Sequence, residues 1–475
     1  MPTKSPNILV VMSDQHNADG VNWLDTRVFT PNLDRLRQDG VNFTAAYCNN
    51  PLCVPSRLSF MSGMSTQTIE AWSLNDALRP AVATWPVKLR SLGYETVMSG
   101  RMHAIWGDRK LGFEKRLCGD GEFQLTSGPN RPNWDRPETP GFGPQGILSN
   151  IGVDGNYPRR TDDETALAKA VDYLHARSQS SRERPFALCV GFFQPHPPFV
   201  PPREFWELYK DSDVELEPFD ESLPAFMRDH AVNRRYRETI PPENKRTAIR
   251  AYRAMISQVD AYAGRLLDTL QETGLYEDTL VVYTSDHGEL LGHRGMWHKQ
   301  CLLERSVKVP LIIKYPGKLS AGATVSTPVS LLDLYPTFAQ LAGAEADCFL
   351  EGVSLADPGR VPEHEIFAEY ADFGLQAPRA MLRQGRYKLI EARGYEPVLF
   401  DLDRDPDERK NLAETTDYRS ILASLRSALR QRWNPDETFR KVLHNQKHVD
   451  VWAKACGLGG ESPPAGRKPA AGPSD

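Results

Sequence analysis

Four short apolar runs alternate with amphipathic helical segments along the first two thirds of the chain, and polar side chains follow each run. The runs are Ile8–Met12, Tyr94–Met98, Phe186–Phe193 and Thr279–Thr284. Uninterrupted apolar runs of this length are typical of strands buried on both faces of a parallel sheet. The alternation therefore predicts an α/β fold, with a large, mostly parallel sheet sandwiched by helices.

The helices between these runs carry recognisable start and stop signals. Thr30 suits an N-cap, Pro31 suits the first helical turn, and Gly40 ends the segment. Further helices are predicted at 85–92, which stops at Gly93, at 163–178 and at 245–271.

Beyond Gly352 the pattern changes to short alternating segments such as Tyr387–Ile390 and Val398–Phe400. With a final amphipathic helix near 418–433, this predicts a smaller C-terminal α+β subdomain with a short antiparallel sheet. We expect a large α/β domain at residues 1–355, the subdomain at 356–445 and a tail at 446–475. Residues 457–475 are rich in Gly, Pro and Ala, which is typical of disorder.

Composition excludes several classes of partner. The formal net charge is -5, and no long Lys/Arg block is present. There is thus no electrostatic reason to expect nucleic acid or an anionic membrane. No apolar run reaches the length of a signal-peptide core or a membrane span, so we expect a soluble, cytoplasmic protein. The seven cysteines contain no CxxC pair, which argues against a disulfide framework or a structural zinc module.

Polar residues at strand ends are candidate site residues, because ligands of parallel sheets gather beyond the carboxyl ends of the strands. A single such Asp or His is usually a turn or capping residue. Four strand ends with chemistry-capable groups favour a shared site. The residues are Asp14, Gln15, Arg101, His103, Gln194, His196, Asp286 and His287.

The segment Cys53-Val54-Pro55-Ser56-Arg57 is the sharpest local feature. Backbone N–H groups at a helix start favour anionic sulfur or oxygen, and Arg57 adds fixed positive charge. An isolated buried cysteine is more often an inert packing residue. The other sequence blocks of the chain favour a functional interpretation of this segment over the packing interpretation.

Cys-x-Pro-Ser-Arg followed by an apolar helix and Gly63 resembles the maturation motif of the sulfatase family. The resemblance covers most of the chain, and its blocks are similar to the choline-sulfatase, arylsulfatase and phosphonate-monoester-hydrolase side of the alkaline phosphatase superfamily. It implies an alkaline-phosphatase-like fold and a maturation enzyme that oxidises Cys53 to Cα-formylglycine. The other blocks are Asn7–Gln15, Ser99–His103, Gln194–Phe199, Thr284–Glu289, Leu399–Leu402, Asp405–Pro406 and Asn411–Leu412.

A metal cage is also implied. Two carboxylates, an amide oxygen and an imidazole suit one divalent cation; the family implies calcium, and the imidazole leaves manganese or magnesium open. A rival zinc cluster of His287, His293 and His298 has possible spacing but no accompanying Cys or His pair. The implied metal ligands are Asp14, Gln15, Asp286, His287 and one oxygen of the modified Cys53.

The resemblance assigns catalytic roles as well. Arg101 and His103 stand where related sulfatases carry a Lys and a His, so they look like a sulfate-binding cation and a base acting on the formylglycine hydrate. Arg101 cannot release a proton near neutral pH, so we expect a purely electrostatic role for it. His196 and Lys299 look like contacts to the bridging ester oxygen, with His298 adjacent. The implied catalytic residues are Cys53, Arg57, Arg101, His103, His196 and Lys299.

The sequence therefore predicts a sulfuric ester hydrolase for a small sulfate monoester of an aryl, choline or carbohydrate alcohol. Two alternatives stay open: a phosphonate monoester or phosphodiester hydrolase with the same machinery, and a catalytically silent binding homologue. The segment Phe439–Trp452 is expected to reach a neighbouring subunit of a dimer or tetramer. Candidate pocket residues are His16, Trp72, Trp106, His230 and Tyr370.

Overall fold

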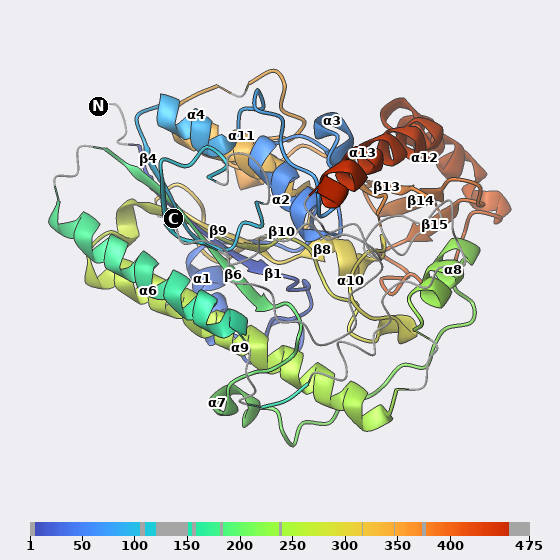
Figure 1. The fold of residues 1–475 in the computed structure, drawn as a ribbon, viewed down its shortest axis with the longest axis horizontal. Coiled ribbons are helices and arrows are strands. Elements are labelled where there is room, and N and C mark those ends of the chain that lie inside the picture. Colours follow the sequence, from blue (N-terminus) through green and yellow to red (C-terminus); the bar gives the residue numbers. More distant parts are fainter. Residues whose placement is uncertain are drawn as a thin grey trace.

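The computed structural model describes residues 5–104, 110–119, 151–153, 158–180, 184–236, 240–315, 317–345, 347–372 and 377–455. A sheet of eight strands, in the order β10-β2-β9-β7-β1-β6-β4-β5, forms the centre of the large domain (Figure 1). Its middle strands are parallel and contain the four predicted runs, so the predicted fold class is confirmed. These strands are β1 (Asn7–Asp14), β4 (Glu95–Gly100), β6 (Phe186–Pro195) and β7 (Thr279–Ser285).

Shorter strands complete this sheet and a small second one. Strand β9 pairs antiparallel with both β7 and β2. The remaining strands of the large sheet are β2 (Val41–Phe43), β5 (Lys115–Cys118), β9 (Leu311–Lys314) and β10 (Ala323–Val325). A three-stranded sheet contains β3 (Ala46–Tyr47), β8 (Lys308–Val309) and β11 (Val329–Ser330).

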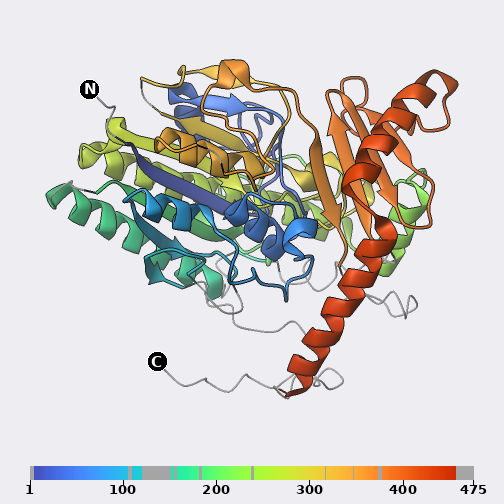
Figure 2. The same ribbon diagram turned by 90° about the horizontal axis from the view of Figure 1, so that it is seen from above.

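Helices cover both faces of the large sheet, as Figures 1 and 2 show. Alternate residues of β1 enter different cores: Val10 packs with Leu58 and Trp85, whereas Leu9 packs with Leu33 and other side chains of the opposite layer. This two-sided burial explains why the strand sequences are continuously apolar. One layer contains α1 (Pro31–Asp39), α6 (Pro158–Gln179) and α9 (Pro242–Glu272). The other contains α2 (Cys53–Ser62), α4 (Trp85–Ser91) and α11 (Leu334–Leu341).

The start of α1 differs from the prediction in one detail. Thr30 holds the N-cap position, but its hydroxyl accepts from the Asn22 amide instead of capping the helix. The carboxylate of Asp260, on α9, accepts from the Leu33 amide at 2.7 Å and the Asn32 amide at 3.2 Å. A side chain more than two hundred residues away thus satisfies the first turn.

The C-terminal part forms the predicted antiparallel sheet: β12 (Ile366–Tyr370), β13 (Arg379–Gln384), β14 (Tyr387–Ala392) and β15 (Val398–Asp401). Helix α12 (Arg419–Arg432) buries Leu425 and Leu429 against it. A further helix, α13 (Pro435–Ala455), was not predicted, and Figure 2 shows it extending past the sheet. The predicted disordered residues 457–475 lie outside the described residues. The division near residue 355 stays a prediction; one apolar core runs through both sheets.

Short helices complete the described structure. They are α3 (Thr66–Ile69), α7 (Arg203–Trp206), α8 (Ala225–Asn233), α10 (Glu304–Val307) and 3-10 turns at Tyr276–Asp278, His293–Gly295, Leu331–Asp333, Pro358–Arg360 and Thr416–Tyr418. Within the described ranges, no helix combines the length and apolarity needed to cross a bilayer. The six cysteines in those ranges are all free.

Candidate active site

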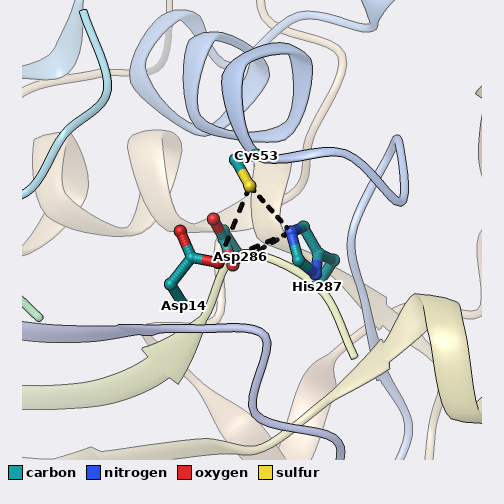
Figure 3. A group of neighbouring side chains, drawn as sticks. All are labelled: Asp14, Cys53, Asp286 and His287. Carbon is teal, nitrogen blue, oxygen red and sulfur yellow. Dashed lines mark hydrogen bonds and ion pairs between the residues drawn. The ribbon is translucent and has the colours of Figure 1, made fainter. Parts of the chain in front are cut away.

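The carboxyl ends of β1 and β7 meet the first residue of α2 at one buried point (Figure 3). β1 and β7 pair in parallel with Ser13 opposite Ser285, so Asp14 and Asp286 leave the sheet side by side. Cys53 Sγ lies 3.2 Å from His287 Nε2 and 3.6 Å from Asp14 Oδ1. Ligand atoms of Asp14, Cys53, Asp286 and His287 all lie within 4.8 Å of one another. The structure therefore brings together residues predicted from separate parts of the chain.

Helix α2 is anchored at both ends. Ser56 Oγ donates to the Asp286 carbonyl at 2.5 Å, which fixes the first turn against the loop after β7. At the other end Gly63 adopts a left-handed conformation with φ of 69°, and its amide donates to the Ser59 carbonyl at 2.8 Å. Cys53 thus sits on the buried first turn, whose free N–H groups favour negative charge.

Arg57 binds the outer oxygens of both aspartates. Its Nε donates to Asp286 Oδ2 at 2.8 Å, its Nη2 to Asp14 Oδ2 at 3.2 Å, and its Nη1 to the Arg101 carbonyl at 2.9 Å. The side chain is completely buried. All three guanidinium nitrogens have protein acceptors, and the arrangement leaves the Oδ1 atoms of both aspartates facing Cys53 and His287.

Arg101 follows β4 and joins the same cluster. Its Nε donates to Asp14 Oδ2 at 2.6 Å, its Nη2 lies 3.0 Å from His103 Nδ1, and its guanidinium stacks on the Phe193 ring. The backbone before it passes very close to β6. A Cβ on Gly191 would lie only 1.8 Å from the Arg101 carbonyl oxygen, so only glycine fits there.

Lys299 approaches the cluster from the loop before α10. Its Nζ donates to Gln15 Oε1 at 2.6 Å and lies 3.1 Å from Cys53 Sγ. His196 packs edge-on against Phe193, and its Nδ1 donates to the Pro197 carbonyl at 2.7 Å. Every residue predicted to be catalytic or metal-binding is thus near the cluster or interacts with a member of it. Gln194 differs, because its buried side-chain amide has no partner in the described structure.

The electrostatics of the cluster favour an ionised Asp14 and a neutral His287 imidazole. Burial disfavours the charged form of Asp14, yet its pKa lies well below its ordinary value because positive side chains surround it. Burial lowers the pKa of His287 to about 4. Its Nδ1 donates to the Gly288 carbonyl at 3.1 Å, so the Nε2 lone pair faces the aspartates. The cations that act on Asp14 are Arg101, His196, Lys299 and Arg57.

This donor set fits a divalent cation. Two carboxylate oxygens, the Gln15 amide oxygen, a neutral imidazole nitrogen and the Cys53 side chain converge from three chain segments. Strained backbone supports the same arrangement, because non-glycine residues around it adopt left-handed φ values: 71° at Gln15, 54° at His103, 69° at His298 and 75° at Gln300.

Two supporting residues were missed at the sequence level. Glu289 is buried and accepts from the Gln15 side-chain amide, from the Leu291 amide at 2.9 Å and from the His298 amide at 2.6 Å. It lies within a block quoted for the resemblance, which was the one available signal. Tyr252 of α9 donates to the Gln15 carbonyl at 2.7 Å, and no local pattern marks it.

The rival zinc cluster does not form. His293 Nδ1 pairs with Glu217 at 3.2 Å, and neither His293 nor His298 belongs to the group of possible metal ligands found in the described residues. The histidine spacing was misleading because the loop turns at Gly292 and Arg294, which separates these side chains.

The predicted pocket residues are dispersed. His16 is buried behind the cluster between Tyr283 and the Gly20 carbonyl. Trp72 donates to Glu369 at 2.9 Å and packs on α13. Trp106 lies outside the described residues. His230 and Tyr370 lie in a buried polar region that also contains Arg234.

Comparison with known proteins agrees with this geometry. The model of the family described as "Sulfatase" matches residues 6–344. The chain belongs to the sulfatase family. It is therefore a sulfuric ester hydrolase. The model described as "N-sulphoglucosamine sulphohydrolase, C-terminal" also matches this sulfatase, at residues 292–434.

Individual relatives place the sulfatase within that family. It is 36% identical over 440 residues to a choline-sulfatase of Rhizobium meliloti, covering 87% of this chain and 83% of the relative. It is 29% identical over 488 residues to arylsulfatase K of Mus musculus, covering 96% and 84%. Among solved structures, a phosphonate monoester hydrolase of Agrobacterium radiobacter has a TM-score of 0.72 at 24% identity, covering 90% and 95%.

Proposed function

We propose that this sulfatase hydrolyses a small sulfate monoester with a nucleophile made by oxidation of Cys53 to formylglycine, beside one divalent cation. The observation that carries the proposal is the position of the Cys53 side chain, 3.1 Å from Lys299 Nζ and 3.2 Å from His287 Nε2. The hydrated aldehyde supplies the attacking hydroxyl, and its second hydroxyl permits release of sulfate. A cation held by Asp14, Gln15, Asp286 and His287 would polarise the sulfate oxygens when bound. Calcium is the first candidate, with manganese or magnesium as alternatives.

Three basic side chains of this chain are proposed to stabilise the other charges that develop during the reaction. Arg101 neutralises sulfate oxygens without transferring protons, since arginine stays charged. Lys299 always presents N–H donors, which suits the bridging oxygen as negative charge develops on it. His196 uses its Nδ1 proton on the Pro197 carbonyl, so its Nε2 donates to a leaving oxygen only as imidazolium.

The hydrogen bond of His103 bears on its proposed role. An arginine nitrogen can only donate, so His103 Nδ1 must accept from Arg101 Nη2. A neutral His103 in this position therefore carries its proton on Nε2 and presents a donor. We propose that it orients or protonates an oxygen in this state, and that it acts as a base only after the Arg101 contact is broken.

Arg57 is proposed as a positioning residue. Because its three nitrogens bind Asp14, Asp286 and a backbone carbonyl, it orients the metal ligands without touching sulfate.

The test combines mass spectrometry with kinetics. The protein is produced with and without a formylglycine-generating maturation enzyme, and the Cys53 peptide is analysed for the aldehyde. We expect hydrolysis of nitrophenyl sulfate to rise in proportion to the aldehyde content and to vanish in Cys53→Ala. Full activity with intact Cys53 would refute the nucleophile. Complete conversion with added metal and no turnover would instead favour the silent binding homologue.

A phosphonate monoester or phosphodiester hydrolase is the second candidate, favoured by the likeness to the solved phosphonate monoester hydrolase. Nitrophenyl sulfate, nitrophenyl phenylphosphonate and bis-nitrophenyl phosphate share one leaving group, so their kcat/KM values compare the reacting centre alone. We expect the sulfate ester to be preferred. A preference of tenfold or more for either phosphorus ester would replace the first proposal with the second.

We also propose that α13 contacts a neighbouring subunit in a dimer or tetramer. Its first half is held on this chain: Val442 packs on Trp72, and Asn445 Nδ2 donates to the Glu70 carbonyl at 3.2 Å. Farther along, Val451 is 69% exposed. Sedimentation equilibrium of a chain ending at Gln446 should show a smaller assembly than the full chain. An unchanged mass would contradict this role. The cytoplasmic location stays a prediction.

A further inference from the structure

One residue of the C-terminal part holds both ends of the loop that carries Lys299. Glu408 follows β15 in the chain and is almost completely buried. Its backbone carbonyl accepts a hydrogen bond from Arg294 Nη1, which comes before Lys299 in the chain. Its side-chain Oε2 accepts from the Glu304 amide at 2.6 Å, after Lys299 and at the start of α10. Glu408 therefore brackets the segment 294–304.

The backbone on either side of Lys299 is strained. His298 and Gln300 adopt left-handed φ values of 69° and 75°, which are unfavourable for residues other than glycine. The His298 amide donates to Glu289 Oε1 at 2.6 Å, and the Gln300 amide donates to the Pro51 carbonyl at 3.3 Å. A strained conformation persists only where the surrounding contacts hold it in place. Releasing one end of the loop is therefore expected to move the Lys299 ammonium.

A buried ion network fixes Glu408 in turn. Lys388 of β14 has a completely buried side chain, and its Nζ lies 2.8 Å from Glu408 Oε1 and 2.9 Å from Glu304 Oε1. Tyr47 OH donates to the other oxygen of Glu304 at 2.6 Å. Both oxygens of a carboxylate accept, so Glu408 serves Lys388 and the Glu304 amide at once. Buried charges paired in this way resist displacement, because separating them leaves an unpaired charge in the interior.

Strand β14 directs this network toward the large domain, since successive side chains of a strand point to opposite faces. Ile390, on the same face as Lys388, belongs to the core that runs through the large sheet. Leu389 and Glu391 point to the other face, where Leu389 packs with side chains of α12 and Glu391 pairs with Arg426 at 2.6 Å. Glu391 is therefore a buried acid of the same sheet that stabilises a different face.

We infer that Glu408 is a positioning residue for Lys299: together with Lys388 it fixes the loop so that the Lys299 ammonium meets the oxygen that leaves with the alcohol. The inference rests on the proposed function, in which Lys299 contacts that bridging oxygen. In this role neither Glu408 nor Lys388 touches sulfate. The C-terminal sheet contributes to the reaction by fixing a loop of the large domain.

The test compares nitrophenyl sulfate with phenyl sulfate, whose phenol is the less acidic leaving group. A phenol without the nitro group disperses less of the negative charge that develops on the bridging oxygen, so phenyl sulfate depends more on Lys299. Both esters are assayed with the same enzyme sample. The ratio of their kcat/KM values is then independent of how much enzyme is folded or converted to the aldehyde. A purely structural defect therefore leaves this ratio unchanged.

The expected results differ between variants. In Glu408→Ala, kcat/KM should fall for both esters and about tenfold further for phenyl sulfate, in the same direction as in Lys299→Ala. Glu408→Gln should shift the ratio by a smaller factor, because its amide oxygen replaces only one of the two carboxylate oxygens that face Lys388 and the Glu304 amide. Glu391→Ala is the matched control and should leave the ratio at the wild-type value.

The double variant Glu408→Ala/Lys299→Ala tests the route of the effect. If Glu408 acts through Lys299, its removal from Lys299→Ala enzyme should change the ratio by less than about twofold. An additive change would overturn the inference, as would a wild-type ratio in any folded Glu408 variant or an equal shift in Glu391→Ala. Glu408→Gln retains the side-chain volume, so the inference stays falsifiable even where Glu408→Ala does not fold.

The outcomes separate this inference from the proposed function. Converted, metal-loaded wild-type enzyme that hydrolyses neither sulfate refutes the proposed function and the inference with it. Hydrolysis by the wild type, with an unchanged ratio in the Glu408 variants, refutes the inference alone.

Discussion

Replacing Arg57 by methionine tests whether one buried guanidinium holds the two aspartates in place. Methionine fills similar space but donates no hydrogen bond. In the native protein Arg57 binds Asp286 at 2.8 Å, Asp14 at 3.2 Å and the Arg101 carbonyl at 2.9 Å. After the change Asp14 keeps its contact with Arg101 at 2.6 Å, whereas Asp286 keeps the Gln15 amide at 3.1 Å but loses its arginine.

The expected magnitude follows from this asymmetry. Removing one partner of a buried ion pair costs about 3–5 kcal/mol, and one such loss is expected because Asp14 stays paired. For a chain of this length unfolding as one unit, that is a fall in Tm of roughly 3–5 °C. Because Asp286 is then free to turn, we expect kcat/KM to fall at least a hundredfold, equivalent to about 3 kcal/mol of transition-state stabilisation.

Tm is measured by thermal unfolding with chelator present, and kcat/KM with nitrophenyl sulfate on enzyme of known aldehyde content. Arg35→Met is the matched control: Arg35 pairs with Asp268 at 2.8 Å at the surface, so about 1 °C or less is expected. A Tm within 1 °C of wild type (~1 kcal/mol) together with kcat/KM within about threefold would refute the positioning role.

Three further predictions follow from separate contacts. Gly191→Ala should lower kcat/KM at least tenfold by displacing Arg101, because the new Cβ would lie 1.8 Å from the Arg101 carbonyl oxygen. Gly152→Ala should leave kcat/KM unchanged, because no atom of the described residues lies within 4 Å of the new Cβ. Chelation should lower Tm reversibly, and adding metal at about a hundred times its Kd should restore about 3 kcal/mol of the free energy of unfolding. A Tm that does not respond to metal would contradict the metal site. Burial raises the pKa of Glu369 to about 7, so the folded state binds its proton more tightly and the resulting stability is lost as pH rises from about 4.5 through 7. Glu369→Gln should remove this pH-dependent loss of about 3 kcal/mol in the free energy of unfolding, whereas Glu114→Gln at the surface should leave it in place. Parallel curves of unfolding free energy against pH for wild type and Glu369→Gln would contradict the prediction.

Much of the fold and the candidate site was accessible from local patterns. A strand buried on both faces must be apolar at every position, so runs such as Ile8–Met12 marked the parallel sheet before any coordinates. Cys53 and the acids at two strand ends were also predictable, because parallel strands bring their carboxyl ends to one edge. Helix α13 escaped prediction, since its first half is fixed by tertiary contacts such as Val442 against Trp72.

The roles within the site depended on packing between distant segments. Nothing near Arg57 in the chain shows that its nitrogens bind Asp14, Asp286 and the Arg101 carbonyl, nor that Tyr252 holds the Gln15 backbone. The partner of His103, and therefore the nitrogen that carries its proton, is likewise a tertiary contact. Periodicity and motifs act over a few residues, so they were enough to predict the sheet and the chemical groups at its edge. Which group holds, faces or donates to which depends on distances between segments, and local patterns do not encode those distances.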